Sequence, residues 1–279
     1  MRRYLAELVG TFFVVFLAAG TVVADVFLTH VRLADSFGPL GLVAAYGAGV
    51  AVAMAIVMPV SGGHLNPAIS IAAYVSKRLS IQDTLGYVVA QLAGALIAGF
   101  LLRALAPKSA FDFASGGVPG LAAGISTLRG AGLETLLTFF VTFAFWAVCI
   151  DDRGHPRAAP AVVGLSVAAA GLVGVSFTGA AVNPARWFGP AVAGTHFASW
   201  IVWVAGPLLG ALLGSLTYEV IFSPAPTEEE IEAAEEELED DEDELAPVGS
   251  GAPASSFTGG QDAEIAQGLD EPVGEGDGT

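Results

Sequence analysis

Apolar residues follow one another in long runs between residues 1 and 222, and charged residues seldom interrupt these runs. The tracts 36–76, 158–185 and 187–218 contain no Asp, Glu, Lys or Arg. About 20 consecutive apolar residues can cross the hydrocarbon core of a bilayer as a helix, because a helix satisfies all of its own backbone groups. We therefore predict six membrane-spanning helices, which lie at about 5–28, 40–60, 84–105, 132–150, 159–177 and 198–222.

Two further apolar stretches, at about 61–76 and 178–193, are too short to cross the membrane. In each, glycine comes first and an Asn-Pro-Ala motif follows, so a continuous helix is not expected. Backbone that is not helical is tolerated at membrane depth only where it is buried in protein or lines a water-filled cavity. Two short stretches in corresponding places therefore predict half-spanning helices beside a pathway through the membrane.

The membrane-spanning part of the chain repeats itself in two halves, at about 4–105 and 131–222. Three motifs recur in the same order, and the offsets between their copies are 127, 117 and 116 residues. Each half holds three spanning helices, so the second half must cross the membrane in the opposite orientation to the first. We therefore predict an all-α membrane protein with six transmembrane helices, two half-spanning helices and an inverted 3+3 repeat. The matched motifs are Glu7–Phe13 with Glu134–Phe140, Ser61–Ala68 with Thr178–Ala185, and Gln91–Ala95 with Pro207–Ala211.

Charge divides the chain close to residue 222. Residues 1–222 hold all 11 Lys and Arg and 9 of the 28 Asp and Glu, a formal charge of +2, whereas residues 223–279 carry −19. A segment this acidic and this poor in apolar residues does not bury enough surface to fold, and it repels nucleic acid. We predict a membrane domain at 1–222, a disordered acidic tail at 223–279, and no nucleic-acid partner. The short flanks on the side of the membrane that holds both termini contain six Lys and Arg, and those on the other side contain four. Because cytoplasmic flanks are the richer in Lys and Arg, this predicts cytoplasmic termini and a cytoplasmic tail.

Side chains suited to catalysis or cofactor binding are scarce. Cys149 is the single cysteine, which excludes a disulfide within the chain and a zinc site built on cysteines. No nucleophile is paired with a base and no cluster of metal ligands occurs in the sequence, so we predict neither an enzyme nor a bound metal or cofactor. A secondary active transporter, which also uses inverted repeats and broken helices, would have to couple transport to Glu7, Glu134 or His64 inside the bundle.

Each Asn-Pro-Ala motif has the composition of a helix start. Proline fits the first helical turn because its missing N–H has no partner there, and asparagine caps the helix with its side-chain oxygen. In an inverted repeat, Asn66 and Asn183 approach each other at mid-membrane and point their NH₂ groups into the lumen. Each half-helix N-terminus places about half a positive charge at this depth, which opposes cations.

The chain resembles the major intrinsic protein family, the aquaporins and aquaglyceroporins, over residues of about 4–222. The resemblance is carried by the two Asn-Pro-Ala motifs, the following Arg186 and the repeated glutamates. The resemblance implies a homotetramer in the lipid bilayer, with one pore in each protomer. The channel is compatible with Glu7 and Glu134 as residues that brace the two loops through hydrogen bonds, and the loop carbonyls are expected to line the pore. The residues so assigned are Asn66, Pro67, Ala68, Asn183, Pro184 and Ala185 in the motifs, and Gly62, Gly63, His64, Leu65, Gly179, Ala181 and Val182 along the pore.

The resemblance further implies an outer selectivity filter, of which Arg186 is the charged member. Spacing from the motifs assigns the other positions to Tyr46, Gly171 and Ala180. Water-selective members usually carry histidine where this chain has Gly171, so we expect a wide filter. Glycerol conductors usually carry aspartate where this chain has Trp187. We therefore expect a passive water channel of the plasma membrane that also admits small neutral solutes. An aquaglyceroporin-type facilitator of glycerol or urea is the alternative.

Overall fold

The computed structural model describes residues 1–31, 33 and 35–223, so the predicted acidic tail lies, beyond its first residue, outside the described residues. Within these ranges all regular structure is helical, and six helices are long and apolar enough to span a membrane. The predicted fold class is therefore confirmed. The six are α1 (Arg2–His30), α2 (Gly38–Ser61), α4 (Ile81–Leu105), α6 (Thr127–Phe145) continued by the π-helical turn η2 (Trp146–Ile150), α7 (Ala159–Thr178) and α9 (Ile201–Phe222).

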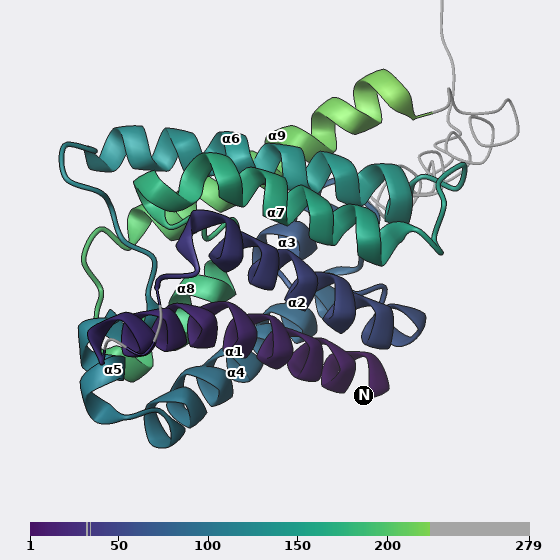
Figure 1. The fold of residues 1–279 in the computed structure, drawn as a ribbon. Helices are drawn as coiled ribbons and strands as arrows, with labels where there is room; N and C mark the ends of the chain where they lie inside the picture. The colour runs from purple at the N-terminus through teal and green to yellow at the C-terminus, as the bar shows by residue number, and fades with distance from the viewer. Residues whose placement is uncertain (32, 34, 224–279) are drawn as a thin grey trace, which may run out of the picture. The chain divides into compact units, whose positions relative to one another are not determined.

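Two shorter helices, α3 (Pro67–Val75) and α8 (Pro184–Gly194), begin at the prolines of the two motifs. The spanning helix before each ends at a glycine in the left-handed region, Gly62 (φ 82°) after α2 and Gly179 (φ 79°) after α7. Glycine adopts this backbone conformation without steric cost, so the chain turns back into the bundle. Each short helix packs most extensively against the other half of the chain, α3 against α9 and α8 against α4. Figure 1 shows both short helices among the longer helices of the bundle.

The two halves pack in corresponding ways. α1 crosses α4 in the first half, and α6 crosses α9 in the second. A Cβ atom on Gly94 would lie 2.2 Å from the carbonyl oxygen of Leu8, and one on Gly210 would lie 2.2 Å from that of Thr135. No side chain fits at such a distance, so glycine is what lets these backbones approach. Across the halves, α2 packs directly on α7.

The connection between α4 and α6 contains structure that the hydrophobic pattern did not predict. It holds the short helix α5 (Lys108–Phe113) and the 3₁₀ turn η1 (Ser115–Gly117). Burial orders this segment, because Phe111 packs with Ala19, Val23 and Leu102 in a small apolar cluster. The turn η1 contacts both α1 and α8, which places it beside the second half-helix.

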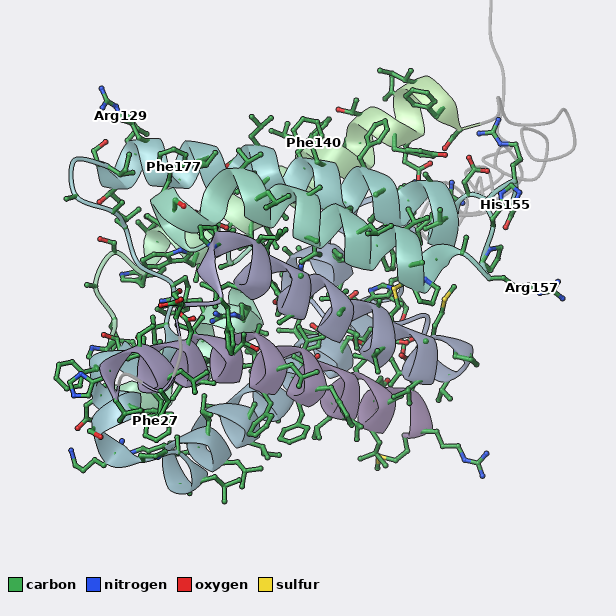
Figure 2. All side chains as sticks on the ribbon, in the orientation of Figure 1. Phe27, Arg129, Phe140, His155, Arg157 and Phe177 are labelled. Atoms are coloured by element: carbon green, nitrogen blue, oxygen red, sulfur yellow. The ribbon has the colours of Figure 1, made fainter. Side chains whose placement is uncertain are left out.

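Apolar and charged side chains are distributed as a membrane requires. Phe140 is 55% exposed on the outer side of α6, as suits a side chain that faces lipid tails rather than water. Arg129 and Arg157 extend from opposite ends of the bundle (Figure 2). The start of α1 and the end of α9 lie at the same end (Figure 1), as an even number of spans demands. The chain is therefore a multi-pass membrane protein.

Candidate functional site

A buried carboxylate from α1 holds the loop before the first half-helix. Glu7 accepts hydrogen bonds from the backbone N–H groups of His64 (3.0 Å) and Leu65 (2.7 Å) and is completely buried. It also accepts from the hydroxyl of Ser61 (2.7 Å) and from the side-chain amide of Gln91 (2.8 Å). The two backbone N–H groups would otherwise be unpaired at membrane depth, where that is costly. The carboxylate thus fixes the backbone that leads into α3.

A second carboxylate, from α6, holds the other loop in the same way. Glu134 accepts from the backbone N–H groups of Ala181 (3.0 Å) and Val182 (2.8 Å) and from the hydroxyl of Thr178 (2.6 Å). It too is completely buried. The residue that corresponds to Gln91 in this half is Pro207, which offers no side-chain donor. Glu134 therefore serves three donors where Glu7 serves four.

Each half-helix begins with an asparagine cap, as its sequence leads one to expect. The side-chain oxygen of Asn66 accepts from the N–H of Ala68, and that of Asn183 accepts from the N–H of Ala185, both at 2.9 Å. Both asparagines have extended backbone, and the proline after each is the first helical residue. At that position the missing N–H of proline costs no hydrogen bond.

The two asparagines also exchange hydrogen bonds across the junction of the half-helices. The amide of Asn66 donates to the carbonyl of Val182, and the amide of Asn183 donates to the carbonyl of Leu65, both at 2.9 Å. Leu65 (φ 51°) and Val182 (φ 45°) have left-handed backbone, which is strained for residues with a side chain and most strained for a β-branched one. One hydrogen of each amide is used in this exchange, and the other is free to donate. The sequence did not predict that each motif is tied to the opposite loop.

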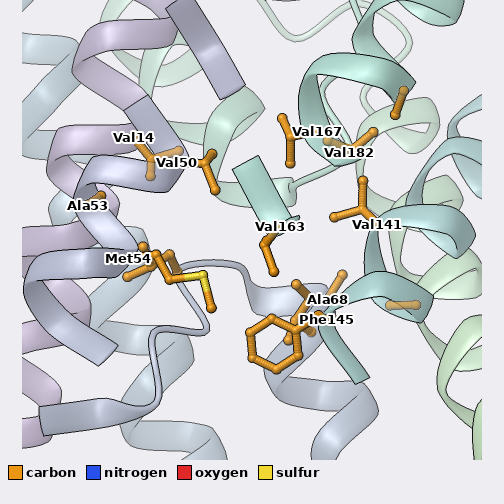
Figure 3. Packing of buried hydrophobic residues seen from close by; sticks show 14 of the residues in the cluster. Val14, Val50, Ala53, Met54, Ala68, Val141, Phe145, Val163, Val167 and Val182 are labelled. Atoms are coloured by element: carbon orange, nitrogen blue, oxygen red, sulfur yellow. The ribbon is translucent and has the colours of Figure 1, made fainter. Parts of the chain in front are cut away.

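A narrow space, which we call the inner cavity, lies where the half-helices meet. Asn66, Asn183 and His64 provide its polar side chains, and valines from four spanning helices provide most of its apolar wall (Figure 3). It offers about 20 Å³ to the centre of a water-sized sphere, which is room for a water molecule. His64 also contacts the hydroxyl of Ser70 through Nδ1 (3.1 Å). The lining consists of Val14, Tyr46, Val50, Met54, Gly63, His64, Leu65, Asn66, Ile69, Val141, Val163, Val167, Val182 and Asn183.

The four residues predicted for the filter line a second space, which we call the outer cavity. Tyr46, Gly171, Ala180 and Arg186 come together there from α2, α7, the second loop and α8. Arg186 is buried, and its Nη1 donates to the carbonyl of Gly117 in η1 (2.8 Å). Its Cζ lies 5.9 Å from the centroid of the Tyr46 ring, a cation–π distance. The outer cavity also offers about 20 Å³, and the rest of its lining is Ala18, Val22, Leu42, Val43, Val175 and Gly179.

Val43 fills part of the width that Gly171 was expected to leave open. A Cβ atom at Gly171 would lie 2.7 Å from Cγ1 and 2.9 Å from Cβ of Val43. Both distances are too short for an ordinary side-chain contact, so any larger residue at position 171 must displace α2 or Val43. The outer cavity is therefore narrower than the absence of a side chain at Gly171 alone suggests.

The loop backbone predicted to line the pore divides between the two cavities. Within the part of the chain that the structure describes, Gly63, His64, Leu65 and Val182 line the inner cavity, Gly179 lines the outer cavity, and Gly62 and Ala181 line neither. The carbonyl of Ala181 accepts instead from the hydroxyl of Tyr46 (2.7 Å). Sequence reasoning missed Val43, Gly117 and Gln91. Only Gln91 carried a signal, as a lone amide in an apolar run.

Charged side chains at the end of the bundle that holds the chain start form a separate network. Arg78 binds Glu219 through two hydrogen bonds (2.9 and 2.8 Å). Asp151 binds Arg153 and the hydroxyl of Tyr218 (2.8 Å), and the Arg153 guanidinium holds the pKa of Asp151 well below its usual range. Across residues 1–31, 33 and 35–223, no group of three His, Cys, Asp or Glu side chains is placed to hold a metal ion.

Comparison with known proteins extends these observations. The sequence model of the family described as Major intrinsic protein matches residues 1–218. Aquaporin TIP4-4 of Zea mays is 40% identical over 226 residues, covering 80% of this chain and 87% of the relative. Aquaporin TIP2-1 of Arabidopsis thaliana is 35% identical over 229 residues, covering 80% and 88%.

A solved structure is similar in fold. The X-ray structure of the aquaglyceroporin from Plasmodium falciparum superposes with a TM-score of 0.69 and covers 79% of this chain and 96% of its own. The sequence identity is 22%, so the likeness concerns the arrangement of helices and not the choice of solute.

Proposed function

The chain belongs to the major intrinsic protein family, and we propose that it is a passive water channel through which small neutral solutes also pass. The path leads through the outer cavity, beside Tyr46 and Arg186, into the inner cavity beside Asn66 and Asn183. The observation that carries the proposal is the asparagine pair. Both side chains line one water-sized cavity, and each keeps one amide hydrogen to donate.

The inner cavity conducts water while it opposes ions. A water molecule that accepts from Asn66 and Asn183 turns its hydrogens away from both, so its neighbours cannot pass a proton through it. The positive ends of two half-helix dipoles face this depth, and they repel cations. The valine walls offer no competing hydrogen bonds, so water leaves as readily as it enters.

The outer cavity selects the solute. Arg186 has further N–H donors beyond the one used on Gly117, and these bind the oxygen of a passing molecule. Its positive charge adds to the barrier for cations. The missing side chain at Gly171 widens the outer cavity and so favours neutral solutes larger than water. This observation supports the second candidate function, a facilitator of glycerol or urea. Val43 limits that widening, which favours water as the main substrate.

Stopped-flow light scattering of proteoliposomes tests the proposal. The purified full chain is reconstituted, and vesicle shrinkage in an osmotic gradient is expected to be several-fold faster than in protein-free vesicles. Glycerol and urea gradients in the same vesicles measure the solute fluxes, and fluxes of both solutes equal to those of protein-free vesicles rule out the facilitator. Shrinkage no faster than in protein-free vesicles, at verified incorporation, contradicts the water channel. Uphill solute uptake driven by protons or sodium contradicts passive transport.

We further propose that the channel is a homotetramer of the plasma membrane with both termini in the cytoplasm. Family membership supports the tetramer, and the Lys and Arg balance of the flanks supports the orientation. Native mass spectrometry measures the number of protomers in the assembly. Protease accessibility of a C-terminal tag in intact cells measures the orientation, and cleavage of the tag from outside contradicts a cytoplasmic C-terminus.

A further inference from the structure

A third space, which we call the lateral cleft, lies beside the two half-helices. It offers about 230 Å³ to the centre of a water-sized sphere, whereas the inner and outer cavities each offer about 20 Å³. Its lining comes from α3, α4, α8 and α9, and within the described part of the chain it shares no residue with either cavity. The lateral cleft is therefore separate from the proposed path, and the passage of water does not account for it.

Each half-helix turns one face to the lateral cleft and another to the cavities. Pro67 and Ile71 of α3 are four residues apart, as are Pro184 and Phe188 of α8, so each pair shares a face of its helix. The residues two positions before Ile71 and Phe188 line the cavities instead, from nearly the opposite face of each helix. The two motif prolines therefore form the floor of the lateral cleft, on the far side of the half-helices from the path.

Two spanning helices form the walls of the lateral cleft. α4 contributes Leu92, and α9 contributes Val204 and Leu208, which are one turn apart. Among the described residues α4 packs on α8 and α9 packs on α3, but α4 and α9 make little contact with each other. All three wall side chains are partly exposed. The lateral cleft is thus a slot between two helices that is open at the surface of the bundle.

This slot opens on a surface that faces lipid. Beside the wall residues, Val89 of α4 is 67% exposed and Leu209 of α9 is 54% exposed, and both belong to membrane-spanning helices whose outer side chains match the polarity of lipid tails. The prolines of the floor lie where the half-helices meet, close to the middle of the membrane. The slot is therefore at the depth of acyl chains and not of headgroups.

The chemistry and the size of the slot decide what can enter it. No polar atom of the described residues lines it, and apolar cavities stay dry because water finds no hydrogen-bond partner there. A helix of another protein is about 10 Å wide with its side chains, which is too wide for a slot of this volume. A single hydrocarbon chain fits, and it gains dispersion contacts with the lining.

We infer that the lateral cleft binds one acyl chain of a bilayer lipid, which packs on Pro67 and Pro184 from the side opposite to the path. The acyl chain fills the gap that α4 and α9 leave between them and supports the start of each half-helix. The inference depends on the location of the protein in a membrane and not on the solute that it conducts.

Tryptophan fluorescence tests the inference in vesicles of phosphatidylcholine that is brominated in the middle of one acyl chain, because bromine quenches an indole ring only near contact. Trp187 lines the lateral cleft and is 6% exposed, so lipid outside the slot barely reaches it. Trp200, which is 52% exposed just before α9, is first replaced by phenylalanine in the full chain. Trp146 and Trp203, which remain, are buried and lie outside the lining. Brominated vesicles are expected to quench the emission of Trp200→Phe, and an added Trp187→Phe is expected to abolish that quenching.

A larger side chain placed in the slot competes with the acyl chain. In the Trp200→Phe background, Val204→Phe fills the slot, whereas Leu209→Phe adds the same ring on the exposed side of the same helix. The quenched fraction of the emission is expected to fall several-fold with Val204→Phe and to stay unchanged with Leu209→Phe. If Val204→Phe does not yield folded protein by gel filtration, Leu92→Phe fills the slot from the opposite wall.

No quenching of Trp200→Phe by brominated vesicles overturns the inference, and so does an equal loss of quenching with Val204→Phe and Leu209→Phe. Quenching that appears only in brominated detergent, after the assembly has dissociated, would show that a neighbouring copy of the protein fills the slot, and it also overturns the inference. Vesicles that show the expected quenching but conduct no water contradict the proposed function alone, so the two failures are distinguishable.

Discussion

The two half-helix loops reach one backbone geometry with different support. In both, a buried glutamate binds two successive backbone N–H groups, and an aromatic side chain donates to the last carbonyl of the preceding helix. Tyr87 donates to Ser61 (2.7 Å) in the first half, and Trp203 donates to Thr178 (3.0 Å) in the second. These bonds occur at corresponding positions in the two halves, so we infer that they maintain the backbone geometry that the two loops share.

Outside these bonds the halves differ in polarity. In the first, the Gln91 amide donates to Glu7 (2.8 Å) and to Ser70 (3.0 Å), and Ser70 contacts His64 (3.1 Å). In the second, apolar packing takes the place of this network. The residues at the places of Gln91, Ser70 and His64 are Pro207, Trp187 and Ala181. The loop geometry therefore depends on the bonds that the two halves share, and not on the network of Gln91, Ser70 and His64 that only the first half has.

Removing either carboxylate is expected to have the largest effect. Glu7→Leu or Glu134→Leu leaves two backbone N–H groups unpaired in the interior, at about 1–3 kcal/mol each. Both variants are expected to lose stability and water flux, Glu7→Leu more so because it serves one more donor. Thermal unfolding in detergent, followed by tryptophan fluorescence, measures this, with Leu136→Ala on the exposed side of α6 as control. A variant with the wild-type unfolding temperature and flux contradicts the role of the carboxylates.

The next effect separates the two half-helices. Arg186 in α8 corresponds to Ile69 in α3, and each lines a different cavity. Arg186→Ala is expected to raise urea and glycerol permeability several-fold while water still flows, because it removes donors and charge from the filter. Ile69→Ala is expected to change the ratio of solute to water permeability less. Loss of water flow in correctly assembled Arg186→Ala would show that the arginine does not act as a filter.

A smaller effect tests whether the polar network of the first half is dispensable. Gln91→Leu removes two hydrogen bonds, at about 0.5–1.5 kcal/mol each, but also an amide oxygen that has no partner in the structure. The unfolding temperature is expected to fall moderately and water flux to persist, because the second half works with Pro207. Gln91→Glu places a second carboxylate beside Glu7 and is expected to be far more damaging. If Gln91→Leu lowered the unfolding temperature and the water flux as much as Glu7→Leu does, the conclusion that the first loop does not need this polar network would be contradicted.

The smallest effect lies at the end of the bundle, away from both loops. The Arg153 guanidinium holds the pKa of Asp151 low, so the native carboxylate stays charged at pH values where the unfolded chain takes up a proton. Its stabilisation is present above about pH 4 and is lost as the pH falls. Asp151→Asn is expected to lower the unfolding temperature slightly at pH 7 and not at low pH. A difference that persists at low pH would contradict this ion pair as its source.

The sequence was sufficient for the features that depend on local composition. The six spans follow from uninterrupted apolar runs, and the starts of α3 and α8 follow from Asn-Pro at a helix N-terminus. Bonds between distant segments could not be predicted in the same way. The amide of Asn183 donates to the carbonyl of Leu65, and Arg186 donates to the carbonyl of Gly117, because of how distant segments of the chain pack against each other.

The same limit applies to the filter. Spacing from the motifs predicted that Tyr46 and Gly171 lie with Arg186 in one filter, and the three residues do line one cavity. It could not show that Val43 fills the space beside Gly171 or that the Tyr46 hydroxyl is used on Ala181. Both depend on rotamers and helix crossings, which local composition does not encode.

Water is expected to pass through the inner cavity, and a thiol placed in its wall tests this most directly. Cys149 is first replaced by serine, and Val167→Cys then puts a thiol in the cavity lining. Leu165→Cys, on the same helix but 70% exposed on its outer side, is the control. Mercuric chloride is expected to lower the water permeability of Val167→Cys vesicles toward the protein-free value, a thiol reductant to restore it, and Leu165→Cys to be unaffected. Unchanged water flow through Val167→Cys that mass spectrometry shows to be fully modified would contradict a water path between the two half-helices.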